Sequence, residues 1–318
     1  MYDYIKIRVD SPSMRRRLRA NPQFKFRNVT SADRNVPTGC NEVAEWRGMM
    51  LFGGITDVKY IQGSLHKLHH SGTNWQQFTF QQVCKTLDEL QIAFEVPLEH
   101  LRVVNLEVGL NIHPFMEPAR ILGCIVLHKT KRPTQMLRGI GIAFNYSDRY
   151  RIKLYDKGYQ YPEAGTCLRV EVKIRDGSIR RRIGVRNALD LKNPDVWHMA
   201  GKYLYDRLAE LVFAEPFVDH IKETDQDRLI LAKCKLPETW IECKPKQRQT
   251  LRNRLKGVHQ RILVRSIRTN ILQLVADSHL ELFNAPGTDA LTRAHATAQA
   301  GANTGGTCTY QVGSLQHG

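Results

Sequence analysis

Residues 149–175, RYRIKLYDKGYQYPEAGTCLRVEVKIR, contain two segments in which polar and apolar residues alternate. Successive side chains of a strand point to opposite faces, so Tyr155 and Lys157 are predicted to share the polar face of the first strand. The second strand repeats the pattern, with Arg169 and Glu171 on its polar face. The stretch therefore predicts two neighbouring strands that carry a phenol, an ammonium, a guanidinium and a carboxylate on faces opposite to the core.

Residues 102–112, RVVNLEVGLNI, alternate in the same way and predict a third such strand, with Glu107 on its polar face. A carboxylate on a central strand is costly unless it is paired or binds a metal ion. Glu107 and Glu171, interleaved with a tyrosine, suit Mg²⁺ or Mn²⁺, which take oxygen ligands and keep open water positions. The alternative is a solvated face with cross-strand ion pairs, such as Glu171 with Lys157, and the pattern favours neither.

The rest of the chain predicts an α+β fold, with a largely antiparallel central sheet, flanking helices and a helical, basic C-terminal part. Further β structure is expected over residues 2–10, 43–69 and 139–146, and helices over residues 78–94, 117–129, 194–214 and 236–283. Asp176-Gly177 predicts a hairpin turn after the 168–175 strand. Residues 1–190 are predicted to form the sheet domain and residues 191–284 a helical accessory region. Residues 285–318, rich in Ala, Gly, Thr and Gln, are predicted to be a disordered tail.

The charge of the chain indicates a polyanionic partner. Its 318 residues include 47 Lys and Arg against 31 Asp and Glu, which gives a formal net charge of +16. Each lysine or arginine that neutralises a phosphate releases counterions, so this excess favours nucleic acid.

The cysteines and the apolar segments indicate the compartment. Seven cysteines without a C-x-x-C pair argue against a disulfide framework and against a zinc finger. There is no apolar run of the ~18 residues that a membrane span needs, and the N-terminus does not resemble a secretory signal. A soluble protein of a bacterial cytoplasm, without a membrane partner, is expected.

Three groups of basic residues predict contacts to DNA. Near the 168–175 strand lie Arg180, Arg181 and Arg182. On the C-terminal helix, Arg248, Arg252 and Lys256 recur every four residues and share one face. Few acids lie nearby, so this face favours phosphate contact over a lattice of ion pairs. His66 and Lys67 are expected to contact substrate phosphate; the alternative is an exposed loop.

The three polar strands resemble those of the phage and plasmid rolling-circle replication initiators typified by the filamentous-phage gene-two and gene-X proteins. The resemblance covers about residues 55–175. It rests on Tyr155-Asp156-Lys157, which matches the family's Tyr-x-Lys, on Leu168-Arg169-Val170-Glu171 and on Asn105-Leu106-Glu107. Gln160 stands where the family has a glutamate five residues after the tyrosine. Its amide oxygen can ligate a metal, but it cannot act as a carboxylate base.

The resemblance implies that Tyr155 attacks the scissile phosphate, forms a 5′-phosphotyrosine and releases a 3′-hydroxyl primer. It implies that Lys157 lowers the pKa of the phenol or stabilises the transition state. A divalent metal, Mg²⁺ or Mn²⁺, would be held near Glu107 and Glu171 with Gln160 as a further ligand, and Arg169 would contact DNA. The implied partners are the origin duplex and its single strand, with host replication proteins such as a helicase.

Two other functions remain open from the sequence. A non-catalytic nucleic-acid-binding protein would use the same basic faces, and it predicts that Tyr155, Glu107 and Glu171 are scattered in space. A relaxase or a transposase of related chemistry would differ in its DNA substrate rather than in these residues.

Overall fold

The computed structural model describes residues 1–136 and 139–285, and this part of the chain contains one large antiparallel sheet. Its strands lie in the order β2-β3-β4-β5-β1-β6-β11-β10-β9-β8. The strands are β1 (Tyr2–Val9), β2 (Arg27–Asn28), β3 (Glu42–Trp46), β4 (Met49–Gly53), β5 (Val58–Ser64), β6 (Leu101–Ile112), β8 (Thr134–Gln135), β9 (Gly141–Tyr146), β10 (Tyr150–Asp156) and β11 (Leu168–Ile174). The α+β class with a largely antiparallel sheet is confirmed.

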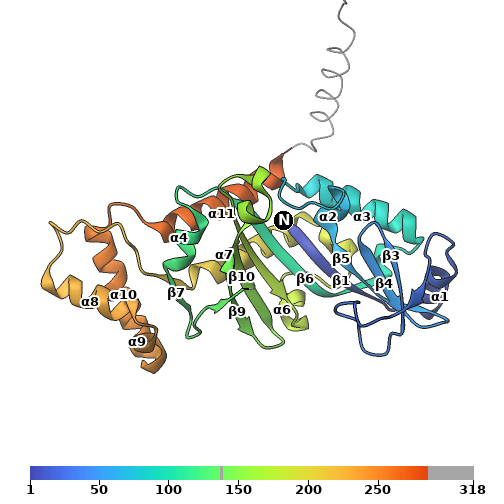
Figure 1. Cartoon of the computed structure of the whole chain (residues 1–318), viewed down its shortest axis with the longest axis horizontal. Coiled ribbons are helices and arrows are strands. Elements are labelled where there is room, and N and C mark those ends of the chain that lie inside the picture. Colours follow the sequence, from blue (N-terminus) through green and yellow to red (C-terminus); the bar gives the residue numbers. More distant parts are fainter. Residues whose placement is uncertain (137–138, 286–318) are drawn as a thin grey trace, which may run out of the picture.

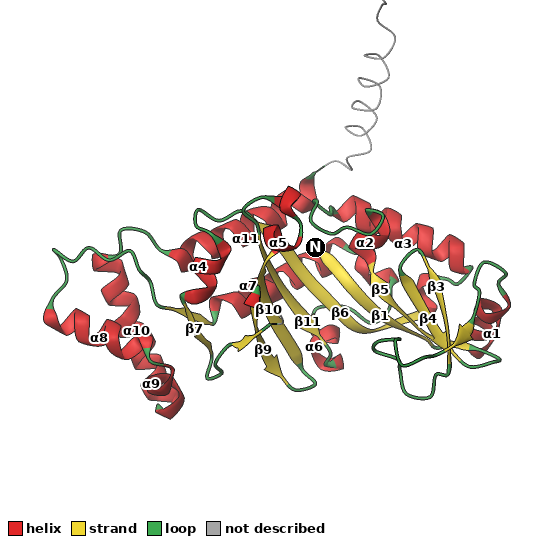
Figure 2. Ribbon diagram, in the orientation of Figure 1, coloured by secondary structure: helices red, strands yellow, loops and turns green. Residues whose placement is uncertain are grey.

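Helices cover one face of this sheet because its central strands present unbroken apolar rows there. Val108, Leu154 and Val172, one from each of three neighbouring strands, are fully buried in the main hydrophobic core. Against this face pack α3 (Phe80–Phe94), α7 (Pro194–Ala209) and α11 (Ile267–Asn284) (Figures 1 and 2). The opposite face of β6, β11 and β10 carries the polar residues.

Two local predictions around the polar strands are wrong, and capping by aspartate is the reason in both cases. Asp176-Gly177 forms no hairpin: the Asp176 carboxylate accepts hydrogen bonds from the N–H groups of Ser178 and Ile179, and α6 (Gly177–Arg182) begins there. Likewise β10 ends at Asp156, whose side chain caps α5 (Lys157–Gln160). Lys157 therefore does not lie on the strand face with Tyr155.

Several expected elements have other bounds in the structure. The basic segment after β1 is a helix, α1 (Pro12–Ala20), and the expected β structure up to residue 69 ends in α2 (Leu65–His69). The helices expected over 117–129 and 194–214 end early, because β7 (Ile125–His128) and β12 (Leu211–Phe213) pair with each other. Shorter elements are α4 (Pro118–Gly123), η1 (Leu98–His100), η3 (Pro162–Ala164) and η4 (Leu189–Lys192).

A helical lobe at one end of the molecule has its own small core. It consists of α8 (Asp225–Lys235), α9 (Pro237–Glu242) and α10 (Pro245–Ile262) (Figure 1). Leu231, Trp240 and Val258 pack there with Leu127 and Val212 of β7 and β12. The segment 236–283, expected to be helical, consists of α9, α10 and α11. Pro237 and Pro245 begin α9 and α10, because the N–H that proline lacks would have no intrahelical acceptor at the first position of a helix.

The chain leaves the main core after β12 to form the lobe and returns to it with α11. The predicted domain boundaries at residues 190 and 284 stay predictions, and the tail predicted from residue 285 falls, apart from Ala285, outside the described residues. Among the described helices, none combines the length and the apolarity that crossing a membrane requires.

Candidate active site

The pairing of three strands gathers the polar residues into one cluster. In the β10–β11 register, Tyr155 lies opposite Arg169 and Lys153 opposite Glu171. On the other side of β11, Glu107 of β6 lies opposite Lys173. Arg169 and Glu171 are almost completely buried, with 2% and 1% of their surface exposed. We call the paired residues of the three strands and the side chains that contact them, directly or through one another, the polar cluster. Its members are Glu107, Lys153, Tyr155, Arg169, Glu171 and Lys173, together with Asp3, Asn74, Asn111, Lys157 and Gln160.

Cations compensate both glutamates of the polar cluster. The Lys153 ammonium contacts Oε1 of Glu171 and lies 3.5 Å from Oε2 of Glu107. Lys173 lies 2.9 Å from Oε1 of Glu107, and Arg169 lies 3.3 Å from Oε2 of Glu171. Burial and the nearby Glu171 nevertheless raise the pKa of the Glu107 carboxyl. Burial opposes the charged form of Lys153, but Glu171 and Glu107 outweigh it and raise its pKa.

The buried Arg169 has a partner far away in the sequence. Its Nη2 donates to Oδ2 of Asp3 at 2.8 Å, and its Nη1 donates to Oδ1 of Asn111 at 3.1 Å. Asp3 also accepts hydrogen bonds from the Ser64 hydroxyl and, at 3.0 Å, from the Asn74 amide. Burial opposes ionisation of Asp3, yet Arg169 and these hydrogen bonds hold its pKa below the usual value.

Sequence reasoning missed Asp3, because strict alternation puts it on the same face as Ile5 and Ile7. A register shift between Tyr2 and Ile5 in the pairing of β1 with β6 changes that assignment. The bulge lets Tyr2 pack against Trp197 in the core while Asp3 reaches the polar cluster. The one signal in the sequence is a carboxylate inside an otherwise apolar row.

Tyr155 donates a weak hydrogen bond to Glu171, with 3.5 Å between its hydroxyl oxygen and Oε2. Burial first, and then the negative charge of Glu171, raise the pKa of this phenol above its ordinary value. The free protein therefore holds Tyr155 protonated, with a carboxylate as the acceptor of its hydrogen bond.

Lys157 is placed beside the tyrosine ring rather than at its hydroxyl. Its Nζ lies 5.6 Å from the centre of the Tyr155 ring and donates to Oδ1 of Asn74 at 2.6 Å and to Oε1 of Gln160 at 3.0 Å. Burial and the Arg169 charge lower the pKa of Lys157 to about 8. The pKa of the Tyr155 phenol is raised rather than lowered, and burial is the largest cause.

Two glycines, one on β6 beside β11 and one on β9 beside β10, leave room for the polar cluster. A Cβ atom on Gly109 of β6 would lie 2.7 Å from Cβ of Glu171, and one on Gly141 of β9 would overlap Cβ of Tyr155. Gly109 interrupts an alternating strand, which is a sequence signal for the close approach of other groups. Any larger residue at either position would displace a member of the cluster.

The side chains expected to hold Mg²⁺ or Mn²⁺ do not fit a metal ion in this arrangement. Each carboxylate oxygen of Glu107 and Glu171 contacts an ammonium or a guanidinium, and the amide oxygen of Gln160 accepts its hydrogen bond from Lys157. Within the described residues, no group of three or more His, Cys, Asp or Glu side chains is placed to bind one. Lysines and an arginine supply the compensating charge instead.

The side chains predicted to contact DNA differ in their accessibility. His66 is buried and stacks on Phe78 with 4.8 Å between ring centres, and burial lowers its pKa. Arg169 is enclosed by the polar cluster, so neither of these two side chains can reach a phosphate backbone in this conformation. The other predicted contacts are exposed or half-buried: Lys67 on α2, Arg180, Arg181 and Arg182 on α6, and Arg248, Arg252 and Lys256 on α10.

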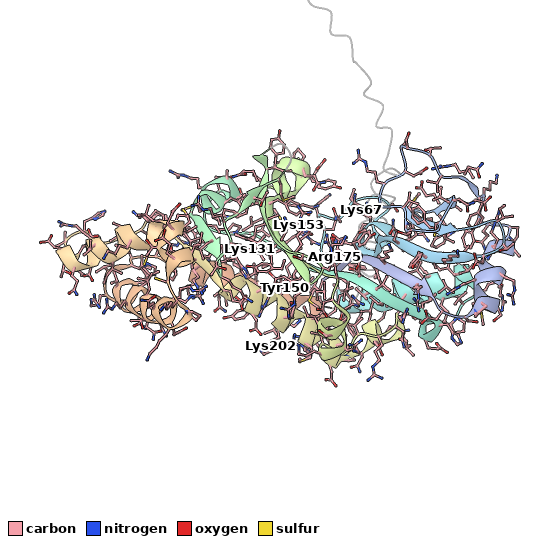
Figure 3. The ribbon with its side chains drawn as sticks, turned by 90° about the horizontal axis from the view of Figure 1, so that it is seen from below. Lys67, Lys131, Tyr150, Lys153, Arg175 and Lys202 are labelled. Atoms are coloured by element: carbon pink, nitrogen blue, oxygen red, sulfur yellow. The ribbon has the colours of Figure 1, made fainter. Side chains whose placement is uncertain are left out.

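Exposed cations flank the polar cluster along the molecule. Figure 3 places Lys153 between Lys67 on one side and Lys131 on the other along the long axis of the view, with Arg175 nearby. Lys67, Lys131 and Arg175 are exposed. Such a distribution suits the phosphates of a strand that crosses the sheet.

Comparison with known proteins gives matches among solved structures. No family model matches the chain, and no curated protein matches it. Among solved structures, the chain is similar to a rolling circle replication initiator protein from Geobacillus stearothermophilus. The two are 11% identical, the match covers 74% of this chain and 96% of that chain, and the TM-score is 0.41. An assignment of function therefore depends on the residues of the polar cluster and not on this likeness.

Proposed function

We propose that this protein initiates rolling-circle replication by nicking and rejoining one DNA strand, with Tyr155 as the nucleophile. The observation that carries the proposal is the Tyr155 hydroxyl, which lies 3.5 Å from a buried carboxylate oxygen of Glu171 inside a cluster of cations. A phenol, a proton acceptor and several fixed positive charges are the groups that phosphoryl transfer to a tyrosine requires.

In the proposed step, the Tyr155 oxygen attacks the scissile phosphorus in line and its proton passes to Oε2 of Glu171. The bond from phosphorus to O3′ breaks, the O3′ takes a proton from water, and the 5′ phosphate stays on the tyrosine. The phenolic proton leaves as the bond from the Tyr155 oxygen to phosphorus forms, and the surrounding cations stabilise the negative charge that then develops on the phosphate oxygens. Rejoining is the reverse reaction, with a 3′-hydroxyl as the nucleophile.

The Lys157 side chain is fully buried in the free protein, so we propose that it binds a non-bridging oxygen of the scissile phosphate only after the polar cluster has opened to the DNA. An ammonium has three N–H donors, of which Asn74 and Gln160 accept two, so one remains for a substrate oxygen. In this role Gln160 orients Lys157 rather than ligating a metal. The proposal includes no metal ion, because the carboxylates of Glu107 and Glu171 are already paired with the protein's own cations.

The exposed arginines of α6 and the basic face of α10 are proposed to hold the origin, with host replication proteins such as a helicase acting on the released 3′ end.

If the protein were a non-catalytic nucleic-acid-binding protein, Tyr155, Glu107 and Glu171 would be expected to lie scattered in space. Their connection through Lys153 and the Tyr155 hydrogen bond favours catalysis instead. A relaxase or transposase would be distinguished by its substrate.

The test is capture of a covalent adduct between the protein and labelled single-stranded DNA that carries candidate origins. We expect Tyr155→Phe to abolish the adduct and to leave DNA affinity unchanged. Tyr159→Phe is the matched control, because Tyr159 is 66% exposed and only four residues away. Adducts that persist in Tyr155→Phe would show that another residue is the nucleophile.

A further inference from the structure

A pocket of about 580 Å³ lies at the junction between the helical lobe and the sheet. Residues of α10 line one side of it, and β12 and the segment 263–269 line the other. The chain enters the lobe through the segment around Val218 and leaves it through the segment around Leu263. These two segments run antiparallel beside the pocket and are joined by a β-bridge between Val218 and Leu263. Its volume lies within the range of about 300–1,000 Å³ that is typical of small-molecule sites.

Four cations line this pocket: Arg252, Lys256, Arg265 and Arg268. Within the described part of the chain, none of them makes an ion pair. The two carboxylates of the lining are already engaged. Glu210 contacts His128, Lys129 and Arg207, and Glu215 accepts hydrogen bonds from the hydroxyl of Ser266 and from two N–H groups at the start of α11. The pocket therefore keeps an excess of positive charge, carried by side chains and not by the end of a helix.

An apolar wall and one neutral polar group complete the lining. Val212, Phe213 and Leu255 form the wall. His259 also lines the pocket, and its Nε2 atom is buried without a hydrogen-bond partner. Burial lowers the pKa of His259, so its ring is neutral at pH 7 and can accept or donate one hydrogen bond. Buried polar atoms without partners are rare in proteins, and a bound ligand is one way to satisfy them.

We propose that this pocket binds a nucleoside phosphate. The four cations match a phosphate or a chain of phosphates, and the apolar wall with His259 matches the flat face and the polar edge of a base. The ligand is either a free nucleotide or a nucleotide at the end of a DNA strand, which share this chemistry. The site is distinct from the polar cluster of the sheet and does not depend on the chemistry of Tyr155.

The test is calorimetric titration of the full-length protein with dATP, dTTP, inorganic triphosphate and a 5′-phosphorylated oligonucleotide. We expect dATP or dTTP to bind, and the Arg252→Ala/Lys256→Ala variant to bind it about tenfold or more weakly. The matched control is Lys246→Ala/Arg254→Ala, which removes the same charge from exposed positions of α10 outside the pocket. His259→Ala should weaken binding of the nucleotide but not of triphosphate.

Each outcome decides a point. Competition with dATP by the 5′-phosphorylated oligonucleotide, but not by the same oligonucleotide without its 5′ phosphate, identifies a DNA end as the source of the ligand. Binding of dATP alone identifies a free nucleotide. Equal reductions of affinity in the pocket and control variants, or no binding of any probe at millimolar concentration, would overturn the proposal. A rise of the wild-type melting temperature with dATP provides a readout that needs no variant. Tyr155→Phe should keep nucleotide binding, so failure of this proposal and failure of the nicking mechanism can be told apart.

Discussion

Lys153 of β10 lies directly opposite Glu171 of β11, and its ammonium contacts Oε1 of that carboxylate while also lying 3.5 Å from Glu107. One cation is thus shared by two buried carboxylates. The two glutamates raise the pKa of Lys153 against the effect of burial, whereas the pKa of Glu107 is raised by burial and by Glu171. The negative charges of Glu107 and Glu171 therefore depend on Lys153 for compensation.

Replacing Lys153 with methionine is expected to lower the free energy of unfolding by about 3 kcal/mol at pH 8, because it leaves buried carboxylates uncompensated. The pKa of Glu107, already raised, would rise further. A carboxyl whose folded pKa exceeds its unfolded value of ~4.3 destabilises the fold above the folded pKa, and this cost disappears as the pH falls toward the unfolded value. Urea denaturation at pH 8 and pH 5 measures the difference.

Lys202→Met is the control for that experiment. Lys202 pairs with Asp206 on the surface, with the two side chains 65% and 43% exposed, so its removal should cost at most about 0.5 kcal/mol at either pH. A deficit of Lys153→Met that is the same at pH 5 and pH 8 would contradict the shared-cation arrangement.

Divalent metal binding provides a second prediction at the same residues. In the wild type, Lys153, Lys173 and Arg169 occupy the carboxylate oxygens, so Mn²⁺ should bind weakly. Removing the shared ammonium in Lys153→Met should raise Mn²⁺ affinity by about tenfold or more, and adding Glu107→Gln should remove the gain. Calorimetry or the Mn²⁺ electron paramagnetic resonance signal reports the affinity. Tight binding to the wild type that Glu107→Gln abolishes would instead place a metal in this cluster.

The position of Tyr155 is expected to depend on the missing side chain of Gly141. A Cβ atom there would overlap Cβ of Tyr155, so Gly141→Ala should move the tyrosine, destabilise the protein by about 1–3 kcal/mol and reduce the yield of DNA adduct. Gly123→Ala is the control, because nothing lies within 4 Å of a Cβ at that position of α4. Full adduct yield from Gly141→Ala would mean that the observed placement of Tyr155 is not needed for nicking.

The arginines of α6 are expected to contribute to DNA binding through charge alone. Arg181→Ala/Arg182→Ala should weaken binding and reduce the slope of log affinity against log salt by about 0.7–0.9 for each phosphate that the protein no longer neutralises. Arg16→Ala/Arg17→Ala makes the same change of charge on the exposed part of α1, at the far end of the molecule from the helical lobe (Figure 1). Fluorescence anisotropy across a salt series reports both slopes. An unaltered slope in the α6 variant would remove this patch from the interface.

Local patterns in the sequence predicted the strands that matter most. The alternation over residues 102–112 and 168–175 places Glu107 and Glu171 on polar faces, and both segments are strands in the structure with nearly the expected bounds. The helix bounds were less predictable, because pairing of β7 with β12 ended two helices early. The Asp176-Gly177 pair suits both a hairpin and a helix start, and in the structure the Asp176 side chain caps α6.

The sequence by itself determined that a tyrosine, acids and bases lie on the polar sides of strands, because a period of two is a local property of the chain. Only the tertiary structure decided which of them meet. The strand order places Lys153 between two glutamates, and a bulge brings Asp3 to Arg169 across 166 residues. Asp156 caps a short helix that begins at Lys157 and so ends the strand of Tyr155. Contacts between distant segments follow from strand pairing and burial, which no local pattern encodes.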